Sequence, residues 1–315
     1  MSGLHDSLIK YVTLRRALGS KFYAPALALG HFIEFLERKG AQFITTKLAL
    51  SWATQPLQVQ RATWAQRLST VRRFAAWMSV TDPRNEVPPR GLIKARYRRT
   101  KPYIFSLKEI EQLMLEAFRL PSPTGLRALT YKTLIGLLAS TGLRPGEARA
   151  LEIHDVDLTN GILAIQRTKF EKSRFVPVDD STCAALVHYA KRRDELCPCR
   201  DTEAFLVSER GTRLVRSTAC HTFAKLSILI GLRPVVEGKR VGRGPRLMDF
   251  RHSFATRRLV EWYRAGLDVE REMPQLSTYL GHVSVANTYW YIEAIPELLR
   301  LATDRLIVQH SGAAR

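Results

Sequence analysis

Five residues of this 315-residue chain have side chains that could act together on a phosphate group; in chain order they are Arg144, Lys169, Arg251, His282 and Tyr291. A guanidinium can fork onto two phosphate oxygens, a lysine or histidine can move a proton, and a tyrosine hydroxyl can attack as a nucleophile. Each residue is ordinary when it stands alone. The order of the set and the pattern around each member therefore decide its meaning.

The first pattern, STGLRPGE at residues 140–147, predicts a helix that begins beside Arg144. Pro145 suits the first turn of a helix, where its missing N–H costs nothing, and the amides and dipole of that end favour an anion. Glu147 lies one turn further on, where its carboxylate could hold the Arg144 guanidinium. An ordinary helix start with a surface arginine would look the same.

Two further patterns contribute Lys169 and Arg251. QRTKFEKSR at residues 166–174 predicts a hairpin whose tip places Lys169 on a loop able to reach into a groove, although exposed hairpin lysines are common. MDFRHSFA at residues 248–255 predicts a helix that buries its two phenylalanines. Arg251 stands between them, so it is either an arginine at the edge of the core or a held phosphate clamp.

The last pattern, LGHVSVANTYWY at residues 280–291, predicts a glycine–histidine turn, a polar helix start and a tyrosine nine residues after His282. Tyr289 is a rival nucleophile. Two positions along a helix turn a side chain by about 200°, so Tyr289 and Tyr291 cannot face one phosphate. The spacing from His282 favours Tyr291, and Tyr289 is expected to pack against the domain.

Taken in order, TGLRPGEARAL, TKFEKSRFVPV, MDFRHSFAT and LGHVSVANTYWY resemble the motifs of the tyrosine recombinase (phage integrase) family, over essentially the whole chain. Its two-domain site-specific recombinases of the XerC and XerD kind are the nearest in organisation. The resemblance implies that Arg144 and Arg251 clamp the phosphate and that Tyr291 is the nucleophile. It also implies that Lys169 protonates the departing 5′ oxygen and that His282 donates to the phosphate or assists proton movement.

One position departs from the family pattern. The second box usually begins with a histidine three residues before the second arginine, and here that residue is Met248. Methionine cannot shuttle a proton, so the contact is lost or comes from a neighbour such as His252 or Arg246. Asp249, like Glu147, falls where the family often places a supporting carboxylate.

The chemistry can also be argued without the resemblance. A tyrosine has an ordinary pKa of about 10 and is a weak nucleophile at neutral pH. Two guanidiniums on the non-bridging oxygens would stabilise the pentacoordinate transition state, and their field would favour the phenolate. A covalent intermediate would conserve the energy of the phosphodiester, so rejoining needs no ATP. Because no carboxylates are arranged for two metals, we expect no metal and no other cofactor.

Composition indicates a nucleic-acid partner, because 49 Lys and Arg against 29 Asp and Glu give a net charge of +20. No segment approaches the roughly 18 apolar residues of a membrane-spanning helix. The N-terminus also lacks the charged head and apolar run of a signal peptide. We therefore expect double-stranded DNA rather than a membrane as partner, and a cytoplasmic, nucleoid-associated location.

The elements that must position the site are predicted to be mainly α-helical and to form two domains. Residues 1–81 carry apolar residues at helical spacing only, in helices at 4–18, 25–38, 45–53 and 62–78. The resemblance makes this bundle a core-binding (SAM-like) DNA-binding domain. Residues 82–104 form a proline-broken basic linker. Residues 105–315 form an α-rich catalytic domain with a C-terminal helix and a small antiparallel sheet, with strands at about 162–166 and 175–178.

Basic residues of the last bundle helix and of the linker are the predicted DNA contacts; the alternatives are a merely solvated helix face and a flexible tether. These residues are Arg61, Arg67, Arg72, Arg73, Arg90, Lys94, Arg96, Arg98, Arg99 and Lys101.

The resemblance implies a recombinase that integrates or excises a mobile element through a 3′-phosphotyrosine. It would act as a dimer on each site and a tetramer in synapsis, with a sister recombinase or an accessory DNA-bending protein as a further partner. Two alternatives stay open. One is a type IB topoisomerase, and the other is a catalytically impaired DNA-binding helper or regulator, which Met248 favours. The DNA site and the direction of recombination are not readable from the sequence.

The departing position leads to the first prediction. Because the missing histidine could donate to phosphate where methionine cannot, we expect Met248→His to maintain or raise DNA cleavage by the purified protein. A severe loss of cleavage with folding intact would mean that this pocket is built differently from the family's.

Overall fold

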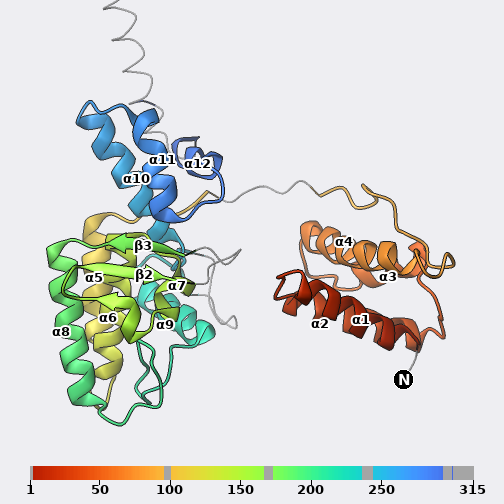
Figure 1. Ribbon diagram of the computed structural model, residues 1–315, viewed down its shortest axis with the longest axis horizontal. Coiled ribbons are helices and arrows are strands. Elements are labelled where there is room, and N and C mark those ends of the chain that lie inside the picture. Colours follow the sequence, from red (N-terminus) through yellow and green to blue (C-terminus); the bar gives the residue numbers. More distant parts are fainter. Residues whose placement is uncertain (1–2, 96–100, 167–172, 236–243, 294–299, 301–315) are drawn as a thin grey trace, which may run out of the picture. The chain divides into compact units, whose positions relative to one another are not determined.

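The computed structural model describes residues 3–95, 101–166, 173–235, 244–293 and 300 (Figure 1). The chain divides into two compact units, Met1–Thr100 and Lys101–Arg315. Within the described ranges, every helix is too short or too polar to span a membrane. The two units are described in turn.

The first unit is a helical bundle of α1 (Gly3–Ala17), α2 (Tyr23–Arg38), α3 (Thr46–Thr54) and α4 (Arg61–Met78). The predicted helices agree with these bounds to within two residues at each end, because apolar residues at three-and-four spacing must share one face. That face is buried: Phe32, Trp52 and Phe74 are each no more than 2% exposed. Aromatic contacts join the helices, as between Phe32 and Trp52, whose ring centroids lie 5.2 Å apart.

The proline-rich stretch after α4 folds back onto the first unit. The Asn85 side chain, which is 2% exposed, accepts a hydrogen bond from the Ile44 N–H at 3.0 Å. The Glu86 N–H donates to the Ile44 carbonyl at 2.8 Å. Residues 82–86 of the predicted linker are therefore part of the bundle's structure.

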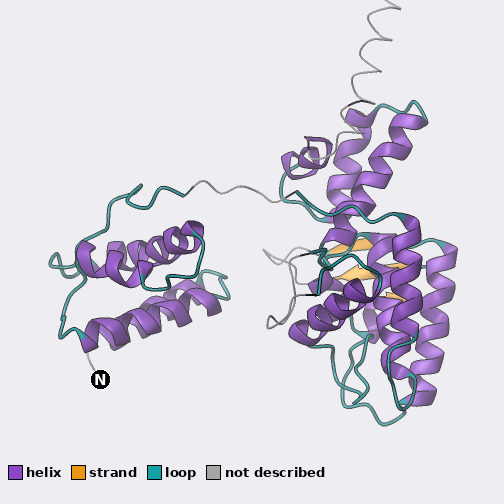
Figure 2. Cartoon of the chain, turned by 180° about the vertical axis from the view of Figure 1, so that it is seen from behind, coloured by secondary structure: helices purple, strands orange, loops and turns teal. Residues whose placement is uncertain are grey.

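The second unit begins with α5 (Leu107–Phe118), capped by the reciprocal hydrogen bonds of Ser106 and Glu109. It continues with the helices α6 (Leu126–Thr141), α7 (Pro145–Ala150) and η1 (Ile153–Asp155), the strands β1 (Val156–Asp157), β2 (Ile162–Ile165) and β3 (Arg174–Pro177), and the helices α8 (Asp180–Leu196), α9 (Arg216–Leu229), α10 (Asp249–Arg264), α11 (Val269–Leu280) and α12 (Ala286–Glu293). Figure 2 shows the few strands among these helices.

The three strands form an antiparallel sheet in the order β1-β2-β3. Leu163 and Val176 are paired across β2 and β3, and both are buried against the helical core. The mainly α fold with a small antiparallel sheet is confirmed. Strand β1 was not predicted, because two residues are too short to show an alternating pattern.

Helix α6 is the centre of the second unit, since most of its residues are buried and α5, α7, α8 and α10 all pack against it. It ends at Gly142, whose φ of +62° is left-handed. A Cβ at this position would lie 2.6 Å from Cδ1 of Phe254 on α10. Glycine is therefore required both by the backbone and by the close approach of α10.

A smaller apolar cluster joins α10, α11 and α12, which lie together in blue in Figure 1. It includes Phe254, Leu259, Met273, Leu280 and Tyr291. The packing of these three helices sets the position of α12, and thus of Tyr291, relative to the end of α11.

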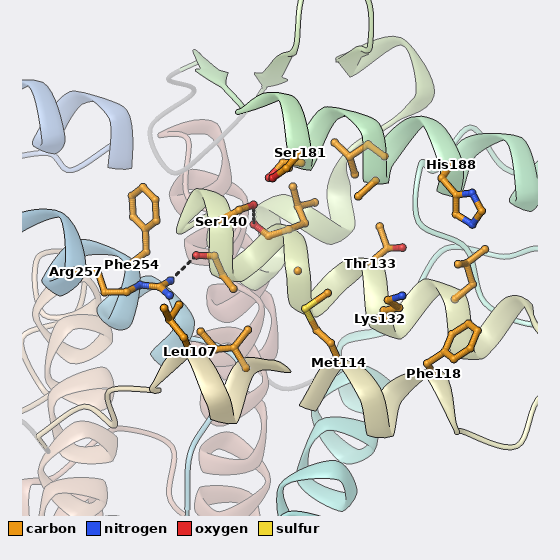
Figure 3. A pocket seen from close by; sticks show the side chains of 18 of the residues that line it. Leu107, Met114, Phe118, Lys132, Thr133, Ser140, Ser181, His188, Phe254 and Arg257 are labelled. Carbon is orange, nitrogen blue, oxygen red and sulfur yellow. Dashed lines mark hydrogen bonds between the residues drawn. The ribbon is translucent and has the colours of Figure 1, made fainter. Parts of the chain in front are cut away.

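A groove of about 760 Å³ opens between α5, α6, α8 and α10. Figure 3 shows Met114 and Phe118 of α5 on one side and Ser181 and His188 of α8 on the other. Arg257 of α10, which donates to the Ala139 carbonyl at 2.8 Å, lies at one end. The groove is lined mainly by apolar residues, in contrast to the arginine-rich end of α11.

Asn85 provides a test of the folded-back stretch. In Asn85→Ala the buried Ile44 N–H loses its acceptor, which should destabilise the first unit by about 1–3 kcal/mol. Hydrogen–deuterium exchange of peptides covering residues 40–55 measures this. Asn160→Ala, which removes an exposed contact with Asp157 in the second unit, should leave that exchange unchanged. Equal effects of the two substitutions would contradict the assignment.

Candidate active site

The C-terminal end of α11 is held by arginines from three different elements. Each of three successive carbonyls accepts one guanidinium N–H: Tyr279 O from Arg174 Nε at 2.7 Å, Leu280 O from Arg251 Nη2 at 2.5 Å, and Gly281 O from Arg144 Nη2 at 3.0 Å. The last carbonyls of a helix lack partners within the helix and carry partial negative charge, so cationic donors stabilise them. The turn that leads to His282 is thereby fixed from three sides.

Glu147 connects two of these arginines. Its Oε1 accepts from Arg144 Nη1 at 2.7 Å and from Arg174 Nη1 at 3.2 Å. Its Oε2 accepts from the Arg144 backbone N–H and from Arg174 Nη2, both at 2.9 Å. These contacts confirm the predicted hold of Glu147 on the Arg144 guanidinium. Burial alone would raise the pKa of Glu147, but the hydrogen bonds and charges of Arg174, and then of Arg144, outweigh it and lower the pKa.

Arg251 is the most deeply buried of the three arginines, at 2% exposure. Besides the Leu280 carbonyl it donates to the Gly142 carbonyl at 3.1 Å. Burial lowers its pKa to about 10, although the nearby Tyr291 acts in the opposite direction. Both partners are neutral carbonyls, so a charged guanidinium here retains its attraction for an anion.

Tyr291 on α12 is 3% exposed and lies between two imidazoles. Its ring centroid is 6.0 Å from that of His282 and 5.5 Å from that of His252. His282 Nδ1 lies 2.7 Å from Oγ1 of the fully buried Thr288, a hydrogen bond that orients the imidazole. Tyr291 therefore has Arg251 and two histidines around it.

Tyr289 is 39% exposed and is therefore only partly covered. Helix α12 buries the face that carries Thr288 and Tyr291, and Tyr289 lies outside that face. The burial of Tyr291 against Arg251 still distinguishes the two tyrosines.

The departing residue Met248 precedes α10 and is 37% exposed. Asp249 is buried, and it accepts hydrogen bonds from the Arg246 N–H at 2.7 Å and from Arg246 Nη2 at 3.3 Å. Asp249 thus shapes the start of α10. Of the two neighbours considered as substitutes for the missing histidine, His252 is the one beside Tyr291.

Arg174 lies in the motif TKFEKSRFVPV but was not predicted as a site residue. Its side chain is only 11% exposed. In β3 it shares the inward face with the buried Val176, while Phe175 between them is exposed. An arginine at an inward position of the strand after the hairpin is the signal that could have identified it.

The predicted DNA contacts divide into three groups. The first group, Arg96, Arg98 and Arg99, lies outside the described residues. The predicted catalytic residue Lys169 and most of the predicted C-terminal helix lie outside them as well. Exposed positions include Arg61, Arg73, Arg90, Lys94 and Lys101. Two half-buried arginines of α4 instead bind the backbone of their own unit.

Arg67 and Arg72 form that third group. The Arg67 guanidinium stacks on the Trp52 ring, 3.7 Å from its centroid, and donates to the Trp52 carbonyl at 3.0 Å. Arg72 donates to the carbonyls of Pro88 and Pro89 at 2.7 and 3.0 Å. Both guanidiniums therefore stabilise the bundle with N–H groups that the sequence predicts to contact DNA phosphates.

Comparisons with known proteins agree in the family they indicate. Residues 104–297 match the phage integrase family. The Sinorhizobium fredii (strain NGR234) protein y4rB, which is named as an integrase/recombinase, is 44% identical over 97% of this chain and 98% of its own. Tyrosine recombinase XerD of Neisseria meningitidis serogroup B is 29% identical over 74% of this chain and 72% of its own. A lambda integrase tetramer bound to a Holliday junction shares the fold, with a TM-score of 0.61, 16% identity and coverage of 91% of this chain and 76% of that one.

Glu147 leads to a prediction about stability and pH. Glu147→Gln weakens charge-assisted hydrogen bonds in a buried place, so we expect a loss of about 2 kcal/mol in the free energy of unfolding at pH 7. Because folding lowers the pKa of Glu147 below its ordinary 4.5, its contribution is present above that value and is lost as the pH falls through the lowered pKa.

Urea unfolding at a series of pH values measures both effects. The substitution should flatten the acid-side decline that the wild type shows below about pH 5. The matched control is Glu152→Gln, because Glu152 also pairs with an arginine, Arg213 at 2.7 Å, but is 37% exposed. Its loss should stay below about 1 kcal/mol. Equal losses in the two variants would contradict the role given to Glu147.

Proposed function

The chain belongs to the phage integrase family, and we propose that it is a site-specific DNA recombinase that cleaves and rejoins strands through a covalent 3′-phosphotyrosine at Tyr291. One observation supports this above the others. The clamped end of α11 brings Arg144, Arg251 and His282 to one place, and Tyr291 packs beside Arg251 and His282.

In the proposed reaction Arg144 and Arg251 bind the non-bridging oxygens of the scissile phosphate. Tyr291 Oη attacks the phosphorus, the bond from phosphorus to the 5′ oxygen breaks, and Lys169 gives that oxygen a proton. The proton of the attacking Tyr291 hydroxyl passes to water, and His282 donates to the phosphate or assists this transfer. Rejoining is the reverse: a 5′ hydroxyl attacks the phosphotyrosine, and Tyr291 recovers its proton.

The charge of Arg251 beside Tyr291 suits this chemistry. Arg251 stays protonated at neutral pH even with its lowered pKa of about 10, and its carbonyl partners leave its charge uncancelled. A cation held in a water-poor site stabilises developing negative charge more than the same cation in water.

Double-stranded DNA is the proposed partner, in agreement with the net charge of +20. We further propose a dimer on each site and a tetramer in synapsis, as the lambda integrase tetramer on a Holliday junction suggests. The integrase/recombinase name of y4rB supports integration or excision of a mobile element as the task. A sister recombinase or DNA-bending protein could assist, and the work would take place at the nucleoid in the cytoplasm.

Covalent capture tests the proposal. The probe is a duplex selected from a random-sequence pool by binding to Tyr291→Phe and then nicked next to the cleaved phosphate, so that the cleaved fragment diffuses away. We expect the wild type and Tyr289→Phe to form a denaturant-resistant protein–DNA adduct in EDTA, and Tyr291→Phe to form none.

Labels at either end of the cleaved strand report the polarity, and the 3′ phosphate should be the one attached. An adduct that persists in Tyr291→Phe and disappears in Tyr289→Phe would overturn the choice of nucleophile. Selected duplexes that bind tightly but are never cleaved by the wild type would favour the DNA-binding helper. Relaxation of plasmid that lacks a selected site would favour the topoisomerase.

A further inference from the structure

Arg174 contacts three parts of the active site at once. Its Nε donates to the Tyr279 carbonyl, and its two terminal nitrogens fork onto the two oxygens of Glu147. Its guanidinium also fills the space beside Gly281, where an added Cβ would lie 2.7 Å from Nη1. One buried side chain on β3 therefore joins α7 to the turn after α11.

We propose that Arg174 is a positioning residue of the recombination reaction, which holds Arg144 and His282 in place by acting through Glu147 and through the turn after α11. The inference rests on the function proposed above, because positioning is defined relative to that reaction. Arg174 itself need not touch DNA.

The first part of the argument is electrostatic. Arg144 and Glu147 alone form a pair of opposite charges, and the carboxylate would cancel the attraction of Arg144 for a phosphate. Arg174 places a second guanidinium on the same carboxylate at 2.9 Å. One negative and two positive charges leave the trio with a net positive charge. Arg144 can then be held rigidly by Glu147 and still bind an anion.

The second part of the argument is geometric. Gly281 has a left-handed φ of +67° and packs directly against Arg174, and the Tyr279 carbonyl is fixed by Arg174 Nε. His282 is the next residue in the chain, so the start of its side chain is set by this turn. Loss of Arg174 would free one carbonyl and open a space beside the glycine, and both changes would loosen His282.

Arg213 provides a matched control. It also pairs with a carboxylate, that of Glu152 at 2.7 Å, and donates to backbone carbonyls, those of Arg149 and Ala150 at 3.2 and 2.8 Å. These carbonyls lie at the C-terminal end of α7, whereas Arg174 acts at its N-terminal end. Both arginines support α7, but only Arg174 faces the proposed catalytic groups.

The test measures single-turnover cleavage of the nicked, selected duplex. We expect Arg174→Ala to cleave about 100-fold more slowly and Arg174→Lys about tenfold more slowly, because lysine keeps the charge but cannot fork onto the carboxylate. DNA affinity, measured in the Tyr291→Phe background, should change by less than about threefold, because Arg174 is not one of the proposed phosphate contacts. Arg213→Ala should cleave at close to the wild-type rate.

Two further readouts separate positioning from general weakening of the fold. On a duplex whose scissile phosphate carries a methyl group in place of one non-bridging oxygen, the anionic charge is gone. The defect of Arg174→Ala should then shrink to about tenfold or less, because a neutral centre demands less of Arg144. In a Glu147→Gln background, Arg174→Ala should slow cleavage by clearly less than its 100-fold effect in the wild type, because the route through Glu147 is already weakened and the contacts with the turn after α11 remain to be lost.

Each of these measurements can contradict the inference. Wild-type rates for Arg174→Lys, additive effects with Glu147→Gln, or an undiminished defect on the neutral phosphate would overturn the inference. If Arg174→Ala fails to fold, the charge-retaining Arg174→Lys carries all three measurements. Failure of the wild type to form any adduct would overturn the proposed function, whereas an active wild type with an equally active Arg174→Lys would overturn the role of Arg174 alone.

Discussion

The candidate active site of this chain depends on how three successive carbonyls at the C-terminal end of α11 are satisfied. The last carbonyls of a helix have no partner within the helix, and here the guanidiniums of Arg144 before α7, Arg174 of β3 and Arg251 of α10 supply the donors. Satisfying these carbonyls therefore brings together residues that lie up to 107 positions apart in the chain, from Arg144 to Arg251. The same three arginines thus satisfy the backbone carbonyls and assemble the candidate site.

Three cations close to one helix end repel one another. A carboxylate offsets this repulsion for two of the arginines but not for the third. Glu147 lies between Arg144 and Arg174, and its lowered pKa shows that it stays ionised at neutral pH. Arg251 is bonded to carbonyls, and burial lowers its pKa. The pair of arginines on α7 and β3 is thus stabilised by a carboxylate, while the most buried arginine is left with uncancelled charge beside Tyr291.

Much of this fold was readable from the sequence, because the apolar spacing of an amphipathic helix is a local pattern. The candidate roles of Arg144, Arg251, His282 and Tyr291 followed from the order and spacing of motifs that resemble the phage integrase family. Arg174 did not, since a strand of four residues is too short to reveal an inward-facing arginine. The phosphate contacts of Arg67 and Arg72 remain predictions. Both guanidiniums also bind the backbone of their own unit, at Trp52 and at Pro88 and Pro89, and charge alone could not reveal this because the direction of a guanidinium depends on tertiary packing.

The clamp on α11 binds main-chain carbonyls, and this has a consequence for how the sequence could vary. Every residue has a carbonyl, so the side chains at positions 279 and 280 could be exchanged for others that fit the surrounding core without removing an acceptor. Position 281 is different, because its φ of +67° and the nearby guanidinium of Arg174 both disfavour a Cβ. Among related chains, the residues at 279 and 280 should therefore be limited by packing alone, whereas position 281 should keep its glycine.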